Sequence, residues 1–428
     1  MRAPYFCNTA AHSVNRRAFL GTSLGAAAAL TPLGFASAAA AKTLQKSQKR
    51  VCVIYLSGGA SQLETWDPKP NTDNGGPFRS IPTSVPGTHI SELLPLSAKQ
   101  AHRLAIVRGV NTKENSHSPG RTIMLTGRRP DPAIQYPHLG AVSAKLLGSE
   151  SDTLPGHISI LPNAEGASNK SDAAFLGPKF AAILLGDGKP PANLLRPKTL
   201  TEEADLQREA LRKKLTDRFA RSRRSAATEA YSESFDQADQ IFRQADLFDV
   251  AKEPAKTSDR YGKHDFARHL LLARRLLEAG VTYVKVSHSN YDTHHENFDF
   301  HLEQMGEFDR PFTAFLDDLQ DRGMLESTLV VVMAEFGRTP KINDRYGRDH
   351  WGTAWSVALA GCGIKGGAVV GKTNANGTAV TDREVNGGHL FHTYLRAVGL
   401  DPKKNFYPND RPVPIADPAA AAIDEILA

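Results

Sequence analysis

Two apolar runs decide the fold: Val281-Thr-Tyr-Val-Lys-Val286 and Leu329-Val-Val-Val-Met333. A segment with helical spacing separates them. This pattern predicts neighbouring parallel strands, because parallel strands cannot be joined by a tight turn. Each run leads into a dense polar cluster, and parallel sheets bind ligands beyond the carboxyl ends of their strands. We therefore expect an α/β fold with a mainly parallel central sheet, helices on both faces and a functional site at this edge.

Similar runs elsewhere extend the predicted sheet. Strand-length apolar segments occur at 51–56, 104–107, 157–161, 355–360 and 368–370. Helices are predicted at 264–278 and 389–398, and at 302–319, where Leu302, Met305, Phe308 and Phe312 recur at helical steps. Pro311 should kink that helix or mark its restart. A stretch near 201–250, rich in Glu, Arg, Lys, Gln and Ala, predicts a helical insertion to which we assign no function.

The N-terminus resembles an export signal. Asn15-Arg16-Arg17-Ala18-Phe19-Leu20 is a twin-arginine pattern, followed by a short apolar run and an alanine-rich cleavage region. We expect residues 1–41 to be a twin-arginine signal peptide that uses the twin-arginine export machinery, 42–50 a basic linker and 51–428 a single domain. The alternative is a disordered basic tail. Export predicts a periplasmic or secreted protein.

Composition excludes several classes of protein. The 428-residue chain carries a formal charge of +6, but three of the excess positive charges lie in 1–41 and four in 42–50, so the remainder is near −1. A nucleic-acid partner is therefore not expected. Only Cys52 and Cys362 lie outside the predicted signal, which excludes a disulfide framework. The signal run is too short for a transmembrane segment, and no other segment is long enough.

The stretch Asn115-Ser-His117-Ser118-Pro119-Gly-Arg121 is the second informative region. A helix that starts just after Pro119 would direct its free N–H groups and positive dipole end toward the ligand of His117 and Ser118, which makes an anion site. Arg121 could orient the anion. The alternative is that Ser118 only caps this helix.

Carboxylates and imidazoles gather at the predicted sheet edge. The candidate metal ligands are Asp292, His294, Glu335, Asp349 and His350, and His117 could be nucleophile, base or ligand. Mixed imidazole and carboxylate ligands suit Zn²⁺ or Mn²⁺ better than Ca²⁺. Taken singly, a histidine near a strand end is more often a hydrogen-bonded structural residue. A cationic rim of Arg121, Arg338, Lys341 and Arg348 suits an anionic group, although plain surface charge is the alternative.

Seven motifs together resemble the exported bacterial proteins of the DUF1501 family. They are Leu56-Ser-Gly-Gly, Thr65-Trp-Asp-Pro-Lys-Pro70, Leu125-Thr-Gly-Arg128, Leu272-Ala-Arg-Arg-Leu-Leu-Glu-Ala-Gly280, Asp292-Thr-His294, Glu335-Phe-Gly-Arg-Thr-Pro340 and Gly347-Arg-Asp-His-Trp351. That family is grouped with the alkaline phosphatase and sulfatase superfamily. The resemblance implies an alkaline phosphatase-like sandwich with metal at the carboxyl edge of its sheet.

The wider superfamily matches in part. Pro119-Gly-Arg121 is similar to the sulfatase signature, whose nucleophile stands two places before the proline, the position of His117 here. Ala334-Glu335-Phe336-Gly337 resembles the strand end where the superfamily places metal ligands. Two departures stand out: the first strand leads into Ser57-Gly-Gly where the superfamily has an acidic pair, and no Cys or Thr occupies the nucleophile position.

The sequence therefore predicts an exported metal-dependent hydrolase of phosphate or sulfate esters that acts on an anionic ester or glycan. The alternative is a non-catalytic envelope protein that uses the same fold to bind an anionic glycan or protein partner. The missing acidic pair favours the binding protein, and the carboxylate and histidine clusters favour the enzyme. Fold alone does not decide between them.

Overall fold

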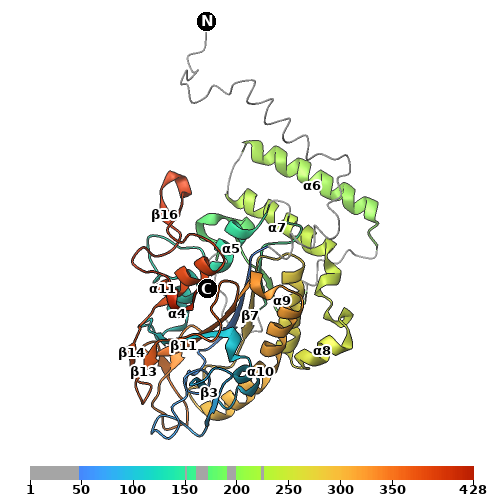
Figure 1. The fold of residues 1–428 in the computed structure, drawn as a ribbon. Coiled ribbons are helices and arrows are strands. Elements are labelled where there is room, and N and C mark those ends of the chain that lie inside the picture. Colours follow the sequence, from blue (N-terminus) through green and yellow to red (C-terminus); the bar gives the residue numbers. More distant parts are fainter. Residues whose placement is uncertain (1–47, 150–151, 161–171, 190–198, 223–225) are drawn as a thin grey trace, which may run out of the picture. The chain divides into compact units, whose positions relative to one another are not determined.

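The centre of the structure, a computed structural model, is an eight-stranded sheet with the order β12-β4-β11-β8-β1-β7-β5-β6 (Figure 1). Its strands are β1 (Arg50–Leu56), β4 (Leu104–Val110), β5 (His157–Ile160), β6 (Ile183–Leu185), β7 (Tyr283–His288), β8 (Thr328–Met333), β11 (Trp355–Gly361) and β12 (Val369–Val370). Strand β11 runs antiparallel to β4 and β8, whereas the other pairs are parallel. The structure describes residues 48–149, 152–160, 172–189, 199–222 and 226–428.

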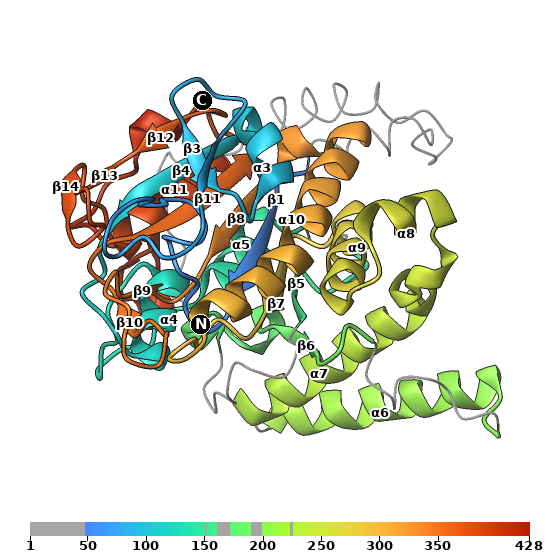
Figure 2. The ribbon, with the colours of Figure 1, turned by 90° about the horizontal axis from the view of Figure 1, so that it is seen from below.

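Helices cover both faces of this sheet (Figure 2). One face carries α3 (Pro95–Lys99), α9 (Asp265–Glu278) and α10 (Asn297–Asp321), with α8 (Ala255–Tyr261) beside them. The other face carries α4 (His117–Thr126), α5 (Leu139–Leu147) and α11 (Gly387–Ala397). The α/β fold class with a mainly parallel central sheet is therefore confirmed.

The apolar runs that open the sequence argument form the interior of the sheet. Every residue of β1, β7 and β8 is buried, as expected for parallel strands covered on both faces. Helix α10 buries Met305, Phe308 and Phe312 against the core and continues to Asp321 without a break at Pro311, so the predicted restart is wrong. Leu302 is also an exception to the predicted apolar face, because it is 56% exposed.

Short two-stranded ribbons form separately from the central sheet. They are β2 (Ser80–Pro82) with β3 (His89–Ser91), β9 (Gly337–Arg338) with β10 (His350–Trp351), β13 (Lys372–Thr373) with β14 (Val380–Asp382), and β15 (Asn405–Phe406) with β16 (Val413–Pro414). The β9–β10 ribbon matters most for function, because it returns the chain from Glu335 to His350 at the same edge of the sheet.

The charged stretch near 201–250 forms two long helices, α6 (Glu202–Ser222) and α7 (Ala226–Arg243). Helix α6 lies against α7 (Figure 1). Residues Ser47–Ala428 form one compact unit. The predicted signal peptide and residues 42–47 of the predicted linker lie outside the described residues. Within the described residues, no helix is long and apolar enough to cross a membrane, and Cys52 and Cys362 are free, buried thiols.

Candidate functional site

Three strand ends and one ribbon bring the candidate residues to one edge of the sheet. Strand β4 leads to His117, β7 leads to Asp292 and His294, β8 leads to Glu335, and the β9–β10 ribbon brings in His350. Because β1, β4, β7 and β8 all run in one direction, their carboxyl ends meet at the same edge. The sequence argument placed both polar clusters there, and the structure does so too.

Imidazole nitrogens and one carboxylate converge at this edge. One ligand atom each from His117, Asp292 and His350 lies within 4.8 Å of the others. Nε2 of His294, which is not one of those three ligand atoms, lies beside them, 3.0 Å from Nε2 of His350 and 3.2 Å from Oδ1 of Asp292. We call these four residues the His₃Asp cluster.

Every histidine of the cluster is held through its other ring nitrogen. Nδ1 of His117 lies 2.7 Å from Oε1 of Glu335, and Nδ1 of His294 lies 2.7 Å from Oδ1 of Asp349. Nδ1 of His350 donates to the backbone oxygen of Asn115 at 2.7 Å. Since these acceptors take the Nδ1 protons, the neutral tautomer of each ring directs a lone pair from Nε2 into the cluster.

Hydrogen bonds and charges shift the pKa values of residues in and next to the cluster. Burial raises the pKa of Asp292, but hydrogen bonds from His117, His350 and Arg338 outweigh this effect and hold it well below its usual range. Hydrogen bonds to Asp292 and Glu335 raise the pKa of His117 to about 9. The hydrogen bond from His294 also lowers the pKa of Asp349. His117 is therefore a cation at neutral pH when the cluster holds no ion.

The glycine turn after β1 holds two residues at the edge of the cluster. The amide of Gly58 donates to Oε1 of Glu335 at 3.0 Å, and the carbonyls of Gly58 and Gly59 accept from the guanidinium of Arg338. Gly58 has a φ of 111°, and a Cβ there would lie 2.5 Å from the amide nitrogen of Asp292. This turn thus holds residues around the cluster and contributes no ligand-type side chain of its own.

Helix α4 starts earlier than predicted. It begins at His117, with Ser116 as the residue before it, so Pro119 lies inside the first turn and Ser118 is not the cap. A proline fits there because the first N–H groups of a helix have no partner within it. Arg121 lies one turn beyond His117 and is half-buried. Loss of solvent is the main cause that lowers the pKa of half-buried His138 to about 4, and the charge of Arg121 adds to it.

Two members of the predicted cationic rim are buried. Arg338 and Arg348 have fully buried side chains. Arg338 contacts Asp292 at 2.5 Å, and Arg348 makes a two-pronged ion pair with buried Glu64 at 2.8 and 3.1 Å. Buried charges require such partners, so the prediction of a rim was wrong for these two. Lys341 is exposed as predicted.

The sequence argument missed Asn115 and Glu64. Asn115 orients His350 through its backbone oxygen. Every residue type has this oxygen, so the sequence does not indicate the contact. Glu64 directly precedes the Thr65–Pro70 motif, but nothing in the sequence connects it with Arg348. By contrast, Arg338 follows Glu335 by only three residues. This position could have indicated that its side chain is buried beside the site.

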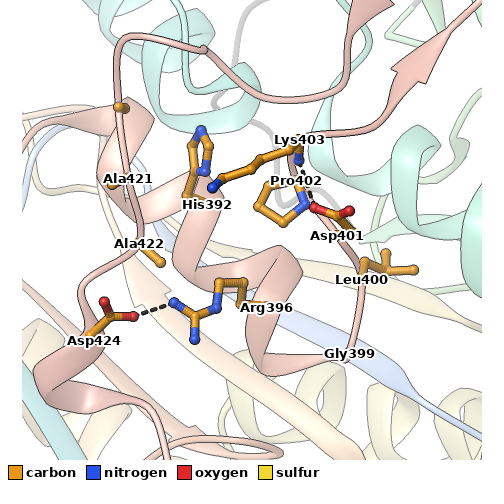
Figure 3. Close-up of a pocket in the computed structure, with 11 residues that line it drawn as sticks. His392, Arg396, Gly399, Leu400, Asp401, Pro402, Lys403, Ala421, Ala422 and Asp424 are labelled. Atoms are coloured by element: carbon orange, nitrogen blue, oxygen red, sulfur yellow. Dashed lines mark hydrogen bonds and ion pairs between the residues drawn. The ribbon is translucent and has the colours of Figure 1, made fainter.

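A separate pocket of about 550 Å³ lies elsewhere, between α11 and the two loops at 399–403 and 420–424. Arg396 and Lys403 supply its positive groups, His392 also lines it, and Arg396 is paired with Asp424 (Figure 3). The pocket includes no member of the His₃Asp cluster, and we assign it no function.

Several solved structures resemble the chain at low identity. The lipoteichoic acid synthase LtaP from Listeria monocytogenes is 9% identical over 83% of this chain and 73% of its own, with a TM-score of 0.38. The PsFucS1 sulfatase from Pseudoalteromonas sp. is 13% identical over 84% and 69%, with a TM-score of 0.38. The phosphonate monoester hydrolase SpPMH from Silicibacter pomeroyi is 14% identical over 85% and 75%, with a TM-score of 0.36.

At this distance we take no residue role from these structures. No curated protein matches the chain. The model of the DUF1501 family, described as "Protein of unknown function", matches residues 48–427, and the chain therefore belongs to that family.

Proposed function

We propose that this chain is an exported, metal-dependent hydrolase of phosphate or sulfate esters. The observation that carries the proposal is the His₃Asp cluster itself. Nε2 atoms of His294 and His350 lie 3.0 Å apart while each Nδ1 already faces an oxygen acceptor. Two neutral rings in this arrangement would bring two lone pairs face to face. A metal ion between the two rings, or a proton on one Nε2, relieves that conflict.

A divalent ion fits the donor set best. His117, Asp292, His294 and His350 would hold it, and Glu335 and Asp349 would orient the rings of His117 and His294. With neutral histidines, the carboxylates of Asp292, Glu335 and Asp349 and the guanidinium of Arg338 sum to two negative charges. An ion with two positive charges neutralises them. Three imidazoles suit Zn²⁺ or Mn²⁺ better than Ca²⁺.

The roles proposed from sequence change accordingly. Glu335 and Asp349 move from the metal ligands to the orienting partners of histidine ligands, a common arrangement around protein metal sites. His117 becomes a ligand. Because its pKa is about 9 in the absence of an ion, it would be protonated at neutral pH and a poor general base.

The surroundings suit an anionic substrate. The first turn of α4 starts at His117, so backbone N–H groups at 117 and 118 lie at the positive end of a ten-residue helix next to the cluster. Arg121 would add a positive charge one turn further along. In hydrolysis, the oxygen of water bonds to phosphorus or sulfur, the bond to the leaving oxygen breaks, and the departing alcohol gains a proton. A bound divalent ion that takes the ester or water as a fifth ligand beside the four side chains would polarise the ester and lower the pKa of water.

A non-catalytic envelope protein that binds an anionic glycan or partner is the second candidate. The glycine turn at Gly58 and Gly59 favours it, because this turn supplies no acidic ligand where the superfamily has an acidic pair. In that case the cluster would bind an ion and an anion without turnover.

The decisive experiment is a hydrolysis assay on protein reconstituted with Zn²⁺ or Mn²⁺. Aryl phosphate, sulfate and phosphonate esters are supplied, and released anion and phenol are measured. We expect turnover that disappears with chelator and in His350→Ala, and a raised KM in Arg121→Ala. Metal-loaded protein that binds sulfate or phosphate without turning over any ester would support the binding protein instead.

Export is tested separately. The twin-arginine pair Arg16 and Arg17 lies outside the described residues, so this proposal rests on sequence alone. Replacing both by lysine should leave the precursor in the cytoplasm. Periplasmic accumulation equal to that of the wild type would contradict twin-arginine export.

A further inference from the structure

Phe336 is a buried phenylalanine whose ring lies against the candidate site. It follows Glu335 directly, shortly after β8 ends, and is 0% exposed. Within the described residues, the cluster of buried side chains that forms the hydrophobic core does not include it. Its ring centroid lies instead 4.3 Å from that of His350 and 5.0 Å from that of His117. The burial of this ring therefore serves the site more than the core.

The rings of Phe336, His117 and His350 form a group of three in mutual contact. The plane of the Phe336 ring is inclined at 32° to that of His350 and at 48° to that of His117. The two imidazoles meet edge to face, at 77°, with their centroids 4.6 Å apart. Ring pairs at such separations attract each other beyond the gain from burial.

The backbone leaves space for the Phe336 ring and little more. A Cβ at Gly59 would lie 2.5 Å from Cε2 of the ring, and Gly59 has a φ of 90°, so glycine is the residue that suits this position. A Cβ at Gly120, in α4, would lie 3.4 Å from Cδ1, on the opposite edge of the ring. The ring is thus held between the glycine turn and α4.

The two imidazoles need a second support of this kind. Nδ1 of His117 faces Glu335, and Nδ1 of His350 faces the backbone oxygen of Asn115. One hydrogen bond fixes one point of a ring, and the ring can still tilt about that point and carry its Nε2 away from the cluster. Contact with the face of Phe336 limits this tilt in both rings.

We propose that Phe336 is a positioning residue that fixes the ring planes of His117 and His350, so that both Nε2 atoms are directed at one ion. This inference rests on the proposed metal site. Ligands that are already arranged before binding do not have to be ordered when the ion arrives. The affinity for metal then depends on a side chain that offers no ligand atom.

Phe312 of α10 offers a matched control. It is also a buried phenylalanine, but it belongs to the hydrophobic core and stacks on Phe308, with the ring centroids 5.0 Å apart. Phe336→Leu and Phe312→Leu each remove a buried ring and keep an apolar side chain. Both should lower stability, and only Phe336→Leu removes a contact with the His₃Asp cluster. Phe336→Met is the second variant, because methionine fills irregular spaces without a planar ring.

The test is the dissociation constant for Zn²⁺, measured by competition with a chelating dye on metal-free, folded protein. Removing an outer partner of a metal ligand usually costs about 10- to 100-fold in affinity. We expect the affinity to fall by about tenfold or more in Phe336→Leu and to stay at the wild-type value in Phe312→Leu. An unchanged affinity in a folded Phe336 variant, or an equal fall in Phe312→Leu, would overturn the proposal. If neither Phe336 variant folds while Phe312→Leu does, the ring serves the fold itself, and the proposal is overturned as well.

Bound Co²⁺ gives a second readout, because its visible absorption depends on the directions of its ligands. Phe336→Leu should change the shape of this spectrum, and Phe312→Leu should reproduce that of the wild type. Identical spectra in all three proteins would overturn the proposal. Wild-type protein that binds neither ion would overturn both this inference and the proposed function. Wild-type binding with an unchanged affinity in Phe336→Leu would overturn only the inference.

Discussion

Replacing Glu335 by glutamine tests whether this carboxylate acts through His117. Glu335 is 2% exposed, and its Oε1 accepts from Nδ1 of His117 and from the amide of Gly58. Its Oε2 is buried without a hydrogen-bond partner. Glutamine keeps the shape and one acceptor but loses the charge, and its NH₂ group takes the buried position of Oε2. Leaving that donor unsatisfied should destabilise the metal-free protein by about 1–3 kcal/mol.

The effect on metal binding has two opposing parts. A weaker partner for His117 should lower the intrinsic affinity by about 10- to 100-fold, or about 1.4–2.8 kcal/mol. The same change lowers the pKa of His117 from about 9. In the wild type at pH 7, the ion must displace a proton from His117, which costs about 2.7 kcal/mol for a gap of about two pH units. The variant avoids part of that cost.

The affinity for Zn²⁺ therefore has to be measured across pH 6.5 to 9.5, with buffers that do not bind the ion. In the wild type, log K should rise by about one per pH unit and level off near pH 9. In Glu335→Gln it should level off at a lower pH and at a lower value, so that the two proteins differ most at high pH. Asp349→Asn, which changes a more exposed partner, should show a smaller effect. Coincident curves for wild type and Glu335→Gln would refute the role of Glu335.

Further predictions concern stability. Removing the ion with chelator should lower Tm, because an ion present at about 100 times its Kd stabilises the native state by about 2.7 kcal/mol; an unchanged Tm would count against a bound metal. In the metal-free protein, the contribution of His117 should be fully present below its ordinary pKa of 6.5 and be lost as pH rises through about 9, where urea unfolding should show falling stability; a flat profile would contradict the raised pKa. Glu64→Gln should cost about 3–5 kcal/mol of unfolding free energy, since it leaves the buried cation of Arg348 unpaired, while the affinity for Zn²⁺ should change little. Gly58→Ala should weaken both stability and metal binding, because its Cβ would lie 2.5 Å from the backbone of Asp292; full Zn²⁺ affinity in this variant would argue against a close turn.

The position of the site could be predicted from sequence for a simple reason. Strands buried on both faces appear in the sequence as continuous apolar runs. Because parallel strands end at one edge of the sheet, the residues that follow them, His117, Asp292 and Glu335 among them, are expected to lie together there. The spacing of residues carries that information. Which oxygen or nitrogen faces inward is set by packing, and a sequence pattern does not carry it.

The assignments that changed all depend on such contacts. Glu335 and Asp349 are the right residue types for ligands, and their position against Nδ1 of His117 and His294 became visible only in the structure. Arg338 and Arg348 were predicted to belong to a cationic rim because their partners, Asp292 and Glu64, are distant in sequence. The first residue of α4 could not be predicted from Pro119. Proline is accepted throughout the first turn of a helix, and this helix starts two residues earlier, at His117.

The metal content of the purified protein tests the proposed metal site most directly. Wild type and His350→Ala are equilibrated with Zn²⁺, the free ion is removed, and elemental analysis gives the number of divalent ions held per chain. His350 donates from Nδ1 to a backbone oxygen and directs Nε2 toward Asp292 at 3.0 Å, so the variant should lose a ligand and keep its fold. The account predicts one ion per wild-type chain and almost none in the variant. A wild-type chain without metal, or a variant with the same content, would contradict it.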